Sequence, residues 1–281
     1  MLKRIVYWIF TNMNKVLNKF FKLQLVRTGY TTVVRDNYFA EDPLDGDILI
    51  NIGAGAWRNK GWLNLDYPSQ WYETAQKGQP NLISYDIRND KLPFANNSVS
   101  AIYCSHVIEH IENCYVENMF NECFRVLHVG GVLRIVCPDT EFLYQVAKSN
   151  TEYFPIPYAD NLYDTMKWRP VDHLVRQIAT RKTLNYKHLT NQIDYIDAFE
   201  TMGMYDFFDY LTNDLTFDEK FVGWHINYWT FDKLKTALTK AGFKTVIRSK
   251  YGGSCSSKMK SIAKFDSSFP CMSLYVEAIK E

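Results

Sequence analysis

Short apolar runs recur along the chain and are separated by polar or amphipathic stretches. The runs at residues 47–52, 62–66, 81–85, 100–105 and 132–137 are each five or six residues long and mostly apolar. Runs of this length that end at turn residues are typical of strands buried on both faces. We therefore predict five short strands of a parallel sheet.

A longer stretch has helical rather than strand spacing. Apolar side chains recur three or four residues apart from Tyr115 to Val126, which predicts a helix over residues 111–127. We expect Gly130 and Gly131 to end this helix, since glycine is common just beyond a helix C-terminus.

The second half of the chain divides into an irregular part and a regular part. Residues 150–225 have no strong strand pattern and predict a mostly helical insertion. Thr230 is expected to cap a following helix, with strands at 244–248 and 272–279. The Ser-, Gly- and Lys-rich residues 250–269 between them predict an exposed loop. Strands that alternate with helices indicate an α/β fold with a doubly wound sheet.

Composition narrows the class of protein. The chain has 281 residues, of which 47% are hydrophobic, and its 32 basic residues nearly balance its 31 acidic ones. This balance gives no electrostatic reason to expect nucleic acid as a partner. The six cysteines include no C-x-x-C pair, which favours reduced thiols in the cytoplasm over a zinc ribbon or a redox site.

Charge is uneven only at the N-terminus. Residues 1–35 contain seven basic side chains, no acidic ones, and many apolar positions between them. The apolar run at 5–10 is too short to cross a membrane. The pattern predicts a basic amphipathic helix, which would either lie on an anionic membrane through residues 1–24 or pack on protein. The first alternative would place the protein at the inner face of the membrane.

The glycine turn after the first predicted strand indicates a ligand that the backbone approaches closely. The sequence Ile-Gly-Ala-Gly-Ala-Trp lacks the lysine of a triphosphate-binding loop. Arg58 stands where a dinucleotide site needs its third glycine, and Asp66 follows Gly55 too closely for a full crossover helix. The turn alone leaves the ligand open.

Three acids stand where predicted strands end or helices begin. Asp66 ends one predicted strand, Asp86 follows another, and Glu109 precedes the predicted helix. The carboxyl ends of parallel strands face a common ligand crevice. A ribose diol and an adenine amino group both need acceptors, so a nucleoside ligand fits these positions.

Four segments together resemble class I S-adenosylmethionine-dependent methyltransferases: INIGAGAW with GWLNLDY, YDIRNDKLPFANNSVSAIYCSHVIEHI, ECFRVLHVGGVLRIVCPD and SLYVEAIK. They look most like a group of predicted methyltransferases often associated with surface-polysaccharide synthesis. The resemblance covers roughly residues 47–145 and 225–280. It implies a Rossmann-like, mostly parallel seven-stranded sheet whose last strand is antiparallel, with S-adenosylmethionine as the cofactor.

The resemblance also implies roles for matching positions. Gly53 and Gly55 would pass beneath the methionine part of the cofactor. Asp66 would bind the ribose hydroxyls, and Asp86 with Ile87 would flank the adenine.

Three further positions belong to the same implied site. Ser105 and His106 would line the floor near the reacting methyl group. Asn51 stands where the family often has an acid, which predicts a weaker contact with the ammonium group of the cofactor.

Catalysis at an oxygen acceptor would benefit from a base, and histidine suits neutral pH. We take His106 and His225 as catalytic candidates, and Asp139 and Glu109 as candidates for substrate binding. His106, Glu109 and His110 also form H-x-x-E-H, a zinc pattern read backwards, but no third ligand is evident, so we predict no metal site.

The predicted organisation has four parts: residues 1–35, a cofactor-binding half at 36–149, a helical substrate lid at 150–225, and the rest of the domain at 226–281. The predicted function is methyl transfer to an oxygen or nitrogen of a small molecule or sugar. The sequence does not indicate an oligomeric state. Two alternatives remain. One is an inactive cofactor-binding protein of a membrane-associated assembly, and the other is a nicotinamide-dependent oxidoreductase.

Overall fold

The computed structural model describes most of the chain. It covers residues 46–77, 82–149, 168–183, 195–262 and 264–281, with the backbone of 23–28 and 31–36.

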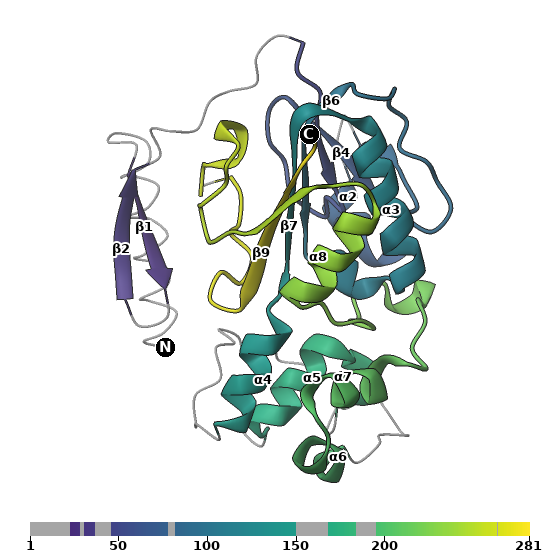
Figure 1. Cartoon of the computed structure of the whole chain (residues 1–281), viewed down its shortest axis with the longest axis vertical. Coiled ribbons are helices and arrows are strands. Elements are labelled where there is room, and N and C mark those ends of the chain that lie inside the picture. Colours follow the sequence, from purple (N-terminus) through teal and green to yellow (C-terminus); the bar gives the residue numbers. More distant parts are fainter. Residues whose placement is uncertain are drawn as a thin grey trace.

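Seven strands form the central sheet, in the order β5-β4-β3-β6-β7-β9-β8 (Figure 1). Their bounds are β3 Leu49–Ile52, β4 Trp62–Asp66, β5 Leu82–Ser84, β6 Val99–Ser105, β7 Leu127–Pro138, β8 Thr245–Arg248 and β9 Ser273–Ile279.

Only β9 runs against its neighbours. It is antiparallel to both β7 and β8, whereas β3 pairs in parallel with β4 and β6, β4 with β5, and β6 with β7. The predicted seven-stranded, mostly parallel sheet with an antiparallel last strand is therefore confirmed.

Helices cover one face of this sheet. They are α3 (Asn113–Val126) and α8 (Phe231–Lys240) (Figure 1). The short α2 (Glu73–Gln76) follows β4 in the chain. The apolar stripe of α3 packs on alternate side chains of the strands, such as Ile102 and Leu133. Thr230 caps α8 as predicted, because its hydroxyl accepts a hydrogen bond from the Lys233 amide.

The opposite face is covered by the chain between β8 and β9. The polar composition of residues 250–269 predicted an exposed loop, and this prediction is wrong for its centre. Met259 and Phe265 are buried against the sheet with Tyr103 and Tyr275. The few apolar residues in this stretch have no regular period, so sequence pattern alone did not reveal that they face inward.

The glycine pair after α3 also differs from the prediction. The helix ends at Val126, and Gly130 and Gly131 lie within the long strand β7. Gly130 has a φ of +84°, and its amide donates to the Lys280 carbonyl. The pair therefore shapes a strand instead of ending a helix.

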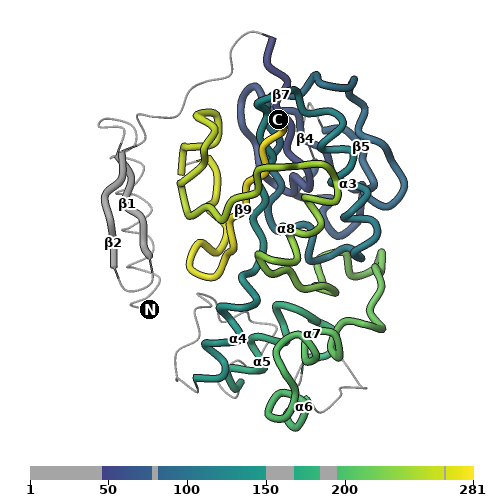
Figure 2. The backbone as a smooth tube through the Cα atoms, viewed as in Figure 1, coloured from purple at the N-terminus to yellow at the C-terminus, as the bar shows by residue number. Residues whose placement is uncertain are grey.

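A helical unit follows β7 and precedes α8, below the sheet in Figures 1 and 2. Its helices are α4 (Thr140–Lys148), α5 (Pro170–Ile178), α6 (Ile196–Thr201) and α7 (Met204–Thr212). The short turns near the sheet and this unit are η1 (Gln70–Tyr72), η2 (Ile108–His110), η4 (Thr180–Lys182), η5 (Glu219–Phe221) and η6 (Ser257–Met259).

This unit has its own hydrophobic core. Tyr195, Phe207 and Leu211 are fully buried in it, and Trp168 is buried beside Trp224. These aromatic residues therefore serve packing.

The N-terminal segment is described only in part. Strands β1 (Leu23–Thr28) and β2 (Thr31–Asp36) form an antiparallel hairpin, so the predicted helix does not extend through residue 35. Residues 1–22, where the amphipathic pattern is strongest, lie outside the described residues.

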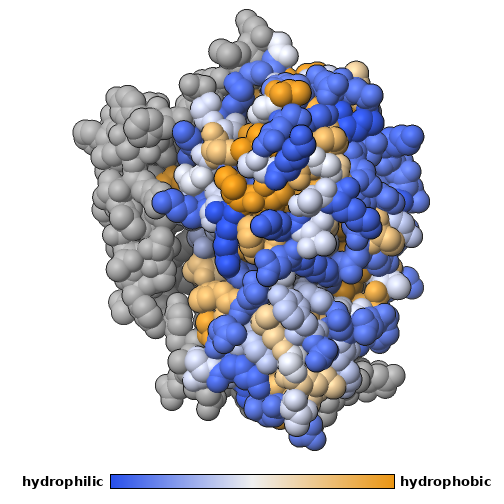
Figure 3. Space-filling view, in the orientation of Figure 1, coloured by the Kyte–Doolittle hydropathy of each residue, from blue (hydrophilic) through white to orange (hydrophobic). Residues whose placement is uncertain are grey.

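The surface in Figure 3 is largely hydrophilic over the helices, with hydrophobic side chains gathered toward the middle of the view. No helix within the described ranges has the length and apolar character needed to cross a membrane.

Candidate functional site

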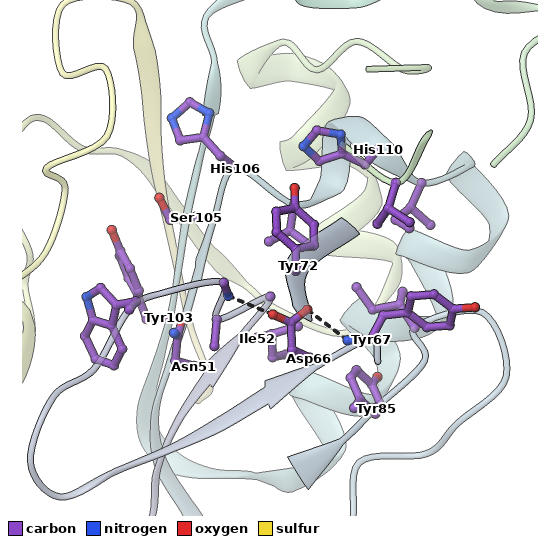
Figure 4. A pocket seen from close by; sticks show the side chains of 18 of the residues that line it. Asn51, Ile52, Asp66, Tyr67, Tyr72, Tyr85, Tyr103, Ser105, His106 and His110 are labelled. Atoms are coloured by element: carbon purple, nitrogen blue, oxygen red, sulfur yellow. Dashed lines mark hydrogen bonds between the residues drawn. The ribbon is translucent and has the colours of Figure 1, made fainter. Parts of the chain in front are cut away.

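A cavity of about 410 Å³ lies at the carboxyl ends of β3, β4 and β6. Eight of the predicted cofactor and catalytic positions line it: Asn51, Gly53, Gly55, Asp66, Asp86, Ile87, Ser105 and His106. In Figure 4, Asp66 and Asn51 lie in the lower part of the view, whereas His106 and His110 lie in the upper part. The fold thus brings together residues that are far apart in sequence.

The glycine turn has the backbone geometry that glycine is needed for. Gly53 and Gly55 have φ values of +71° and +50°. A Cβ atom on Gly53 would lie 2.1 Å from Cγ2 of Val107, so no larger residue fits there without a shift. The Gly53 amide donates to the Leu65 carbonyl over 2.8 Å, which draws the turn toward β4.

The connection from β3 to β4 contains no helix, as the short spacing predicted. A dinucleotide site places the pyrophosphate on the free amides at such a helix N-terminus. Without this helix the cavity has no such phosphate cradle.

Asp66 closes the glycine turn. Its two carboxylate oxygens accept hydrogen bonds from the Gly55 amide at 2.7 Å and the Tyr67 amide at 2.8 Å (Figure 4). Burial raises the pKa of Asp66, and these hydrogen bonds oppose the rise. The Gln76 side chain also donates to this carboxylate. A carboxylate has about four acceptor sites, so Asp66 can still accept from a ligand hydroxyl.

Asp86 lies at the cavity edge, but its carboxylate is engaged locally. Arg88 contacts it at 2.9 Å, and Asn89 donates to it over 2.9 Å. Burial alone would raise the pKa of Asp86, but these hydrogen bonds lower it overall. The Arg88 guanidinium in turn lies 4.1 Å from the ring centroid of Phe217. Asp86 therefore orders this edge, next to Ile87.

His106 is held by both ring nitrogens. Nδ1 lies 3.0 Å from Oε1 of Glu109, and Nε2 lies 3.0 Å from Oγ of Ser273. The backbone of His106 has a φ of +53°, which is uncommon for a residue with a side chain and is often associated with functional sites. Ser105, one residue earlier, also lines the cavity.

Glu109 and His225 lie next to the cavity rather than on its lining. His225 packs edge-to-face on His110, with ring centroids 4.8 Å apart, and His110 does line the cavity. Burial, reinforced by His110, lowers the pKa of His225 to about 3. His225 is therefore neutral at neutral pH.

Asp139 is used structurally. Its side chain caps α4 by accepting from the Phe142 amide, and it forms an ion pair with Arg248 at 2.7 Å. It is not among the residues that line the cavity.

Several lining residues were not predicted from the sequence. Phe217 and Val222 come from the end of the helical unit, and Tyr67 and Tyr72 from the segment after β4. Ser267 and Ser268, from the loop before β9, also line the cavity. No motif or period marks these positions, because only tertiary packing places them at the strand ends.

The residues present fit S-adenosylmethionine. The cavity volume lies in the range of small-molecule sites, a glycine turn allows close backbone approach, and Asp66 offers acceptors to a diol. The missing phosphate cradle is no obstacle, since this cofactor has no phosphate.

One family model matches part of the chain. Residues 58–135 match the family model described as a methyltransferase domain. No curated protein matched the chain.

Among solved structures, similar chains include three methyltransferases. One, described as a possible histamine N-methyltransferase of Thermotoga maritima, is 14% identical, with a TM-score of 0.42 and coverage of 85% of this chain and 84% of that one. Another, from Mesorhizobium loti, is 16% identical, with a TM-score of 0.40 and coverage of 84% and 91%. A third, from Archaeoglobus fulgidus, is 12% identical, with a TM-score of 0.42 and coverage of 84% and 87%. The fold assignment rests on the strand order and not on these likenesses.

Proposed function

We propose that the chain is a class I S-adenosylmethionine-dependent methyltransferase that transfers the methyl group to a hydroxyl of a sugar or other small metabolite. The observation that carries this proposal is the single cavity lining shared by the glycine turn, Asp66 and His106.

Binding of the cofactor divides between backbone and side chains. Asp66 accepts hydrogen bonds from the ribose hydroxyls, and Gly53 with Gly55 lets the backbone pass beside the methionine part. Ile87 packs on the adenine, and the side chain of Asp86 fixes the loop that carries Ile87. The Asn51 amide, which is buried and donates to Asn64, replaces the usual carboxylate near the ammonium group.

His106 is the general base for the acceptor hydroxyl. Its Nε2 lies 3.0 Å from the Ser273 hydroxyl, a hydrogen-bond partner that the acceptor hydroxyl would replace. Glu109 holds Nδ1 and stabilises the imidazolium that forms when Nε2 takes a proton. Burial alone would raise the pKa of Glu109, but the hydrogen bond from His106 and the neighbouring histidines lower it to about 2, so it stays charged.

The bound cofactor supplies an activated methyl group on a sulfonium. Nε2 of His106 would accept the proton that the acceptor hydroxyl loses as its oxygen takes up the methyl group. The protein positions the acceptor and excludes water, and the apolar side chains of Phe217 and Val222 support this exclusion.

Titration calorimetry tests the cofactor assignment. We expect the purified chain to bind S-adenosylmethionine and S-adenosylhomocysteine with micromolar affinity, and not to bind NAD. Binding of NAD alone would favour the oxidoreductase reading and overturn the proposal.

A screen with radiolabelled S-adenosylmethionine tests the acceptor class. We expect transfer to nucleotide-linked sugars or oligosaccharides of the kind used for surface polysaccharides. Transfer only to amines would move the acceptor from oxygen to nitrogen. Cofactor binding without transfer to any acceptor would favour an inactive cofactor-binding protein.

The basic N-terminal sequence supports peripheral membrane contact. Deletion of residues 2–24 should abolish sedimentation with vesicles that contain anionic lipid and leave cofactor affinity unchanged. If the intact chain does not bind such vesicles, the segment packs on protein instead.

A further inference from the structure

Three potential metal ligands meet beside the cofactor cavity. Glu109 and His110 belong to η2, and His225 lies between η5 and α8. One ligating atom of each residue lies within 4.8 Å of the others. No second group of three such ligands lies in the described part of the chain. No step of the proposed methyl transfer uses His110 or His225.

Backbone carbonyls fix both histidine rings. Nδ1 of His110 lies 3.0 Å from the Trp224 carbonyl, and Nδ1 of His225 lies 2.8 Å from the Gln177 carbonyl. A carbonyl oxygen only accepts, so each Nδ1 carries the hydrogen. In the neutral rings, Nε2 is then left with a free lone pair, as in histidines whose other nitrogen is held by a carbonyl while they bind a metal.

Glu109 presents an oxygen that the protein does not satisfy. Oε1 pairs with His106, but Oε2 is buried and has no hydrogen-bond partner. The side chain is only 1% exposed. An unpaired, buried carboxylate oxygen is costly, and it becomes favourable when a cation fills the space beside it.

We propose that Glu109, His110 and His225 bind a divalent transition-metal ion, with Zn²⁺ the best fit. Two imidazole nitrogens and one carboxylate oxygen form a common three-ligand zinc set that leaves a fourth position open. Ligands about 2.0–2.2 Å from zinc lie roughly 3.3 Å apart in a tetrahedral site, so the three side chains need to move inward by about 1 Å at most.

The proposed metal site lies where the ion could assist the loss of a proton from the acceptor hydroxyl. His110 lines the cavity, and Glu109 joins the ion to His106 through its second oxygen. A hydroxyl at the open position would lose its proton to His106 more readily, because a bound cation lowers the pKa of a coordinated oxygen. This role rests on the proposed methyl transfer, whereas metal binding itself does not.

The sequence pattern H-x-x-E-H led to the opposite prediction, because no third ligand was evident near it. In the structure the third potential ligand beside Glu109 and His110 is His225 and not His106. His225 lies there because its ring contacts the Gln177 carbonyl of the helical unit. His106 keeps a different role as the hydrogen-bond partner of Glu109.

The test uses the full chain, stripped with a chelator and dialysed. We expect calorimetry with zinc chloride to give one site per chain, and Co²⁺ to give a spectrum of nitrogen and oxygen ligands without a thiolate band. The absent thiolate band separates this site from the cysteines. His225→Ala and His110→Ala should each weaken zinc binding by roughly 100-fold or more.

His128→Ala is the matched control, because its ring contacts only the Val129 carbonyl at the start of β7, and it should bind zinc like the unaltered chain. Glu109→Gln keeps the side-chain shape and tests the carboxylate if an alanine variant fails to fold. Absence of stoichiometric zinc, or equal affinity in all four variants, would overturn the proposal. S-adenosylmethionine binding by the metal-free chain, measured in parallel, shows separately whether the proposed function holds.

Discussion

The two faces of the central sheet are covered in different ways. On one face, α3 and α8 bury regular apolar stripes against alternate strand residues. On the other face, an irregular loop between β8 and β9 inserts Met259 and Phe265 among aromatic side chains. Both faces bury apolar side chains, but only the first is built from a repeating pattern.

The loop face is held by charge as well as by apolar contact. Arg134, at the centre of β7, is fully buried and pairs with Asp266 of the loop at 2.5 Å and Glu277 of β9 at 3.1 Å. It also donates to the Lys250 carbonyl over 2.9 Å. A single strand residue thus fixes several points of an otherwise irregular segment.

Both faces reach the candidate site. Near the end of the loop, the ring of Phe269 packs near His106, and Ser273, the first residue of β9, contacts Nε2 of His106. The turn η2 before α3 supplies Glu109 and His110. The orientation of His106 therefore depends on the irregular face as much as on the regular one.

Removal of the buried cation should have the largest effect. Arg134→Met leaves two carboxylates buried without a counterion, which we expect to lower the free energy of unfolding by about 3–5 kcal/mol. Chemical denaturation measures this change. The control is Lys240→Met, which breaks an exposed pair with Glu117 and should cost about 1 kcal/mol or less. Equal stability of the Arg134 variant and the unaltered chain would show that apolar contacts alone hold the loop.

Asp66→Ala should affect ligand binding and not the loop face. Loss of a buried acceptor costs about 1–3 kcal/mol, so the Kd for S-adenosylmethionine should rise roughly 5- to 150-fold. Titration calorimetry measures it, with Asp232→Ala on the exposed side of α8 as the control. An unchanged Kd would contradict the ribose assignment.

Ser273→Ala tests whether the loop face positions His106. Loss of one neutral hydrogen bond is worth about 0.5–1.5 kcal/mol, so kcat should fall roughly 2- to 10-fold. Steady-state kinetics and cofactor titration together should show a lower kcat with an unchanged Kd for S-adenosylmethionine. A changed Kd with a normal kcat would instead mean that Ser273 shapes the cofactor site.

The smallest effect should appear on the helix face as a pH dependence. Hydrogen bonds from Arg125, opposed by burial, lower the pKa of Glu122 in the folded protein. A lowered pKa gives stability above the unfolded value of about 4.5 that is lost as the pH falls below it. Glu122→Gln should cost about 1 kcal/mol or less at neutral pH and flatten the decline below pH 4.5. Thermal unfolding across pH checks this, and parallel curves for both proteins would contradict it.

The sequence determined the elements whose signal is local. Strand runs, the α3 stripe and the Thr230 cap were predictable because each depends on neighbours within a turn or a strand. The glycine turn and Asp66 were predictable for the same reason, since both follow strands whose ends face a common crevice.

Tertiary structure alone decided the rest. The loop over the second face has no period, and Arg134 shows its role only once Asp266 and Glu277 stand beside it. Glu109, His110 and His225 likewise lie close together only because the chain, after the helical unit, returns to the ends of the strands. Local sequence pattern indicates which side chains will be buried, whereas long-range packing decides which distant residues become their partners.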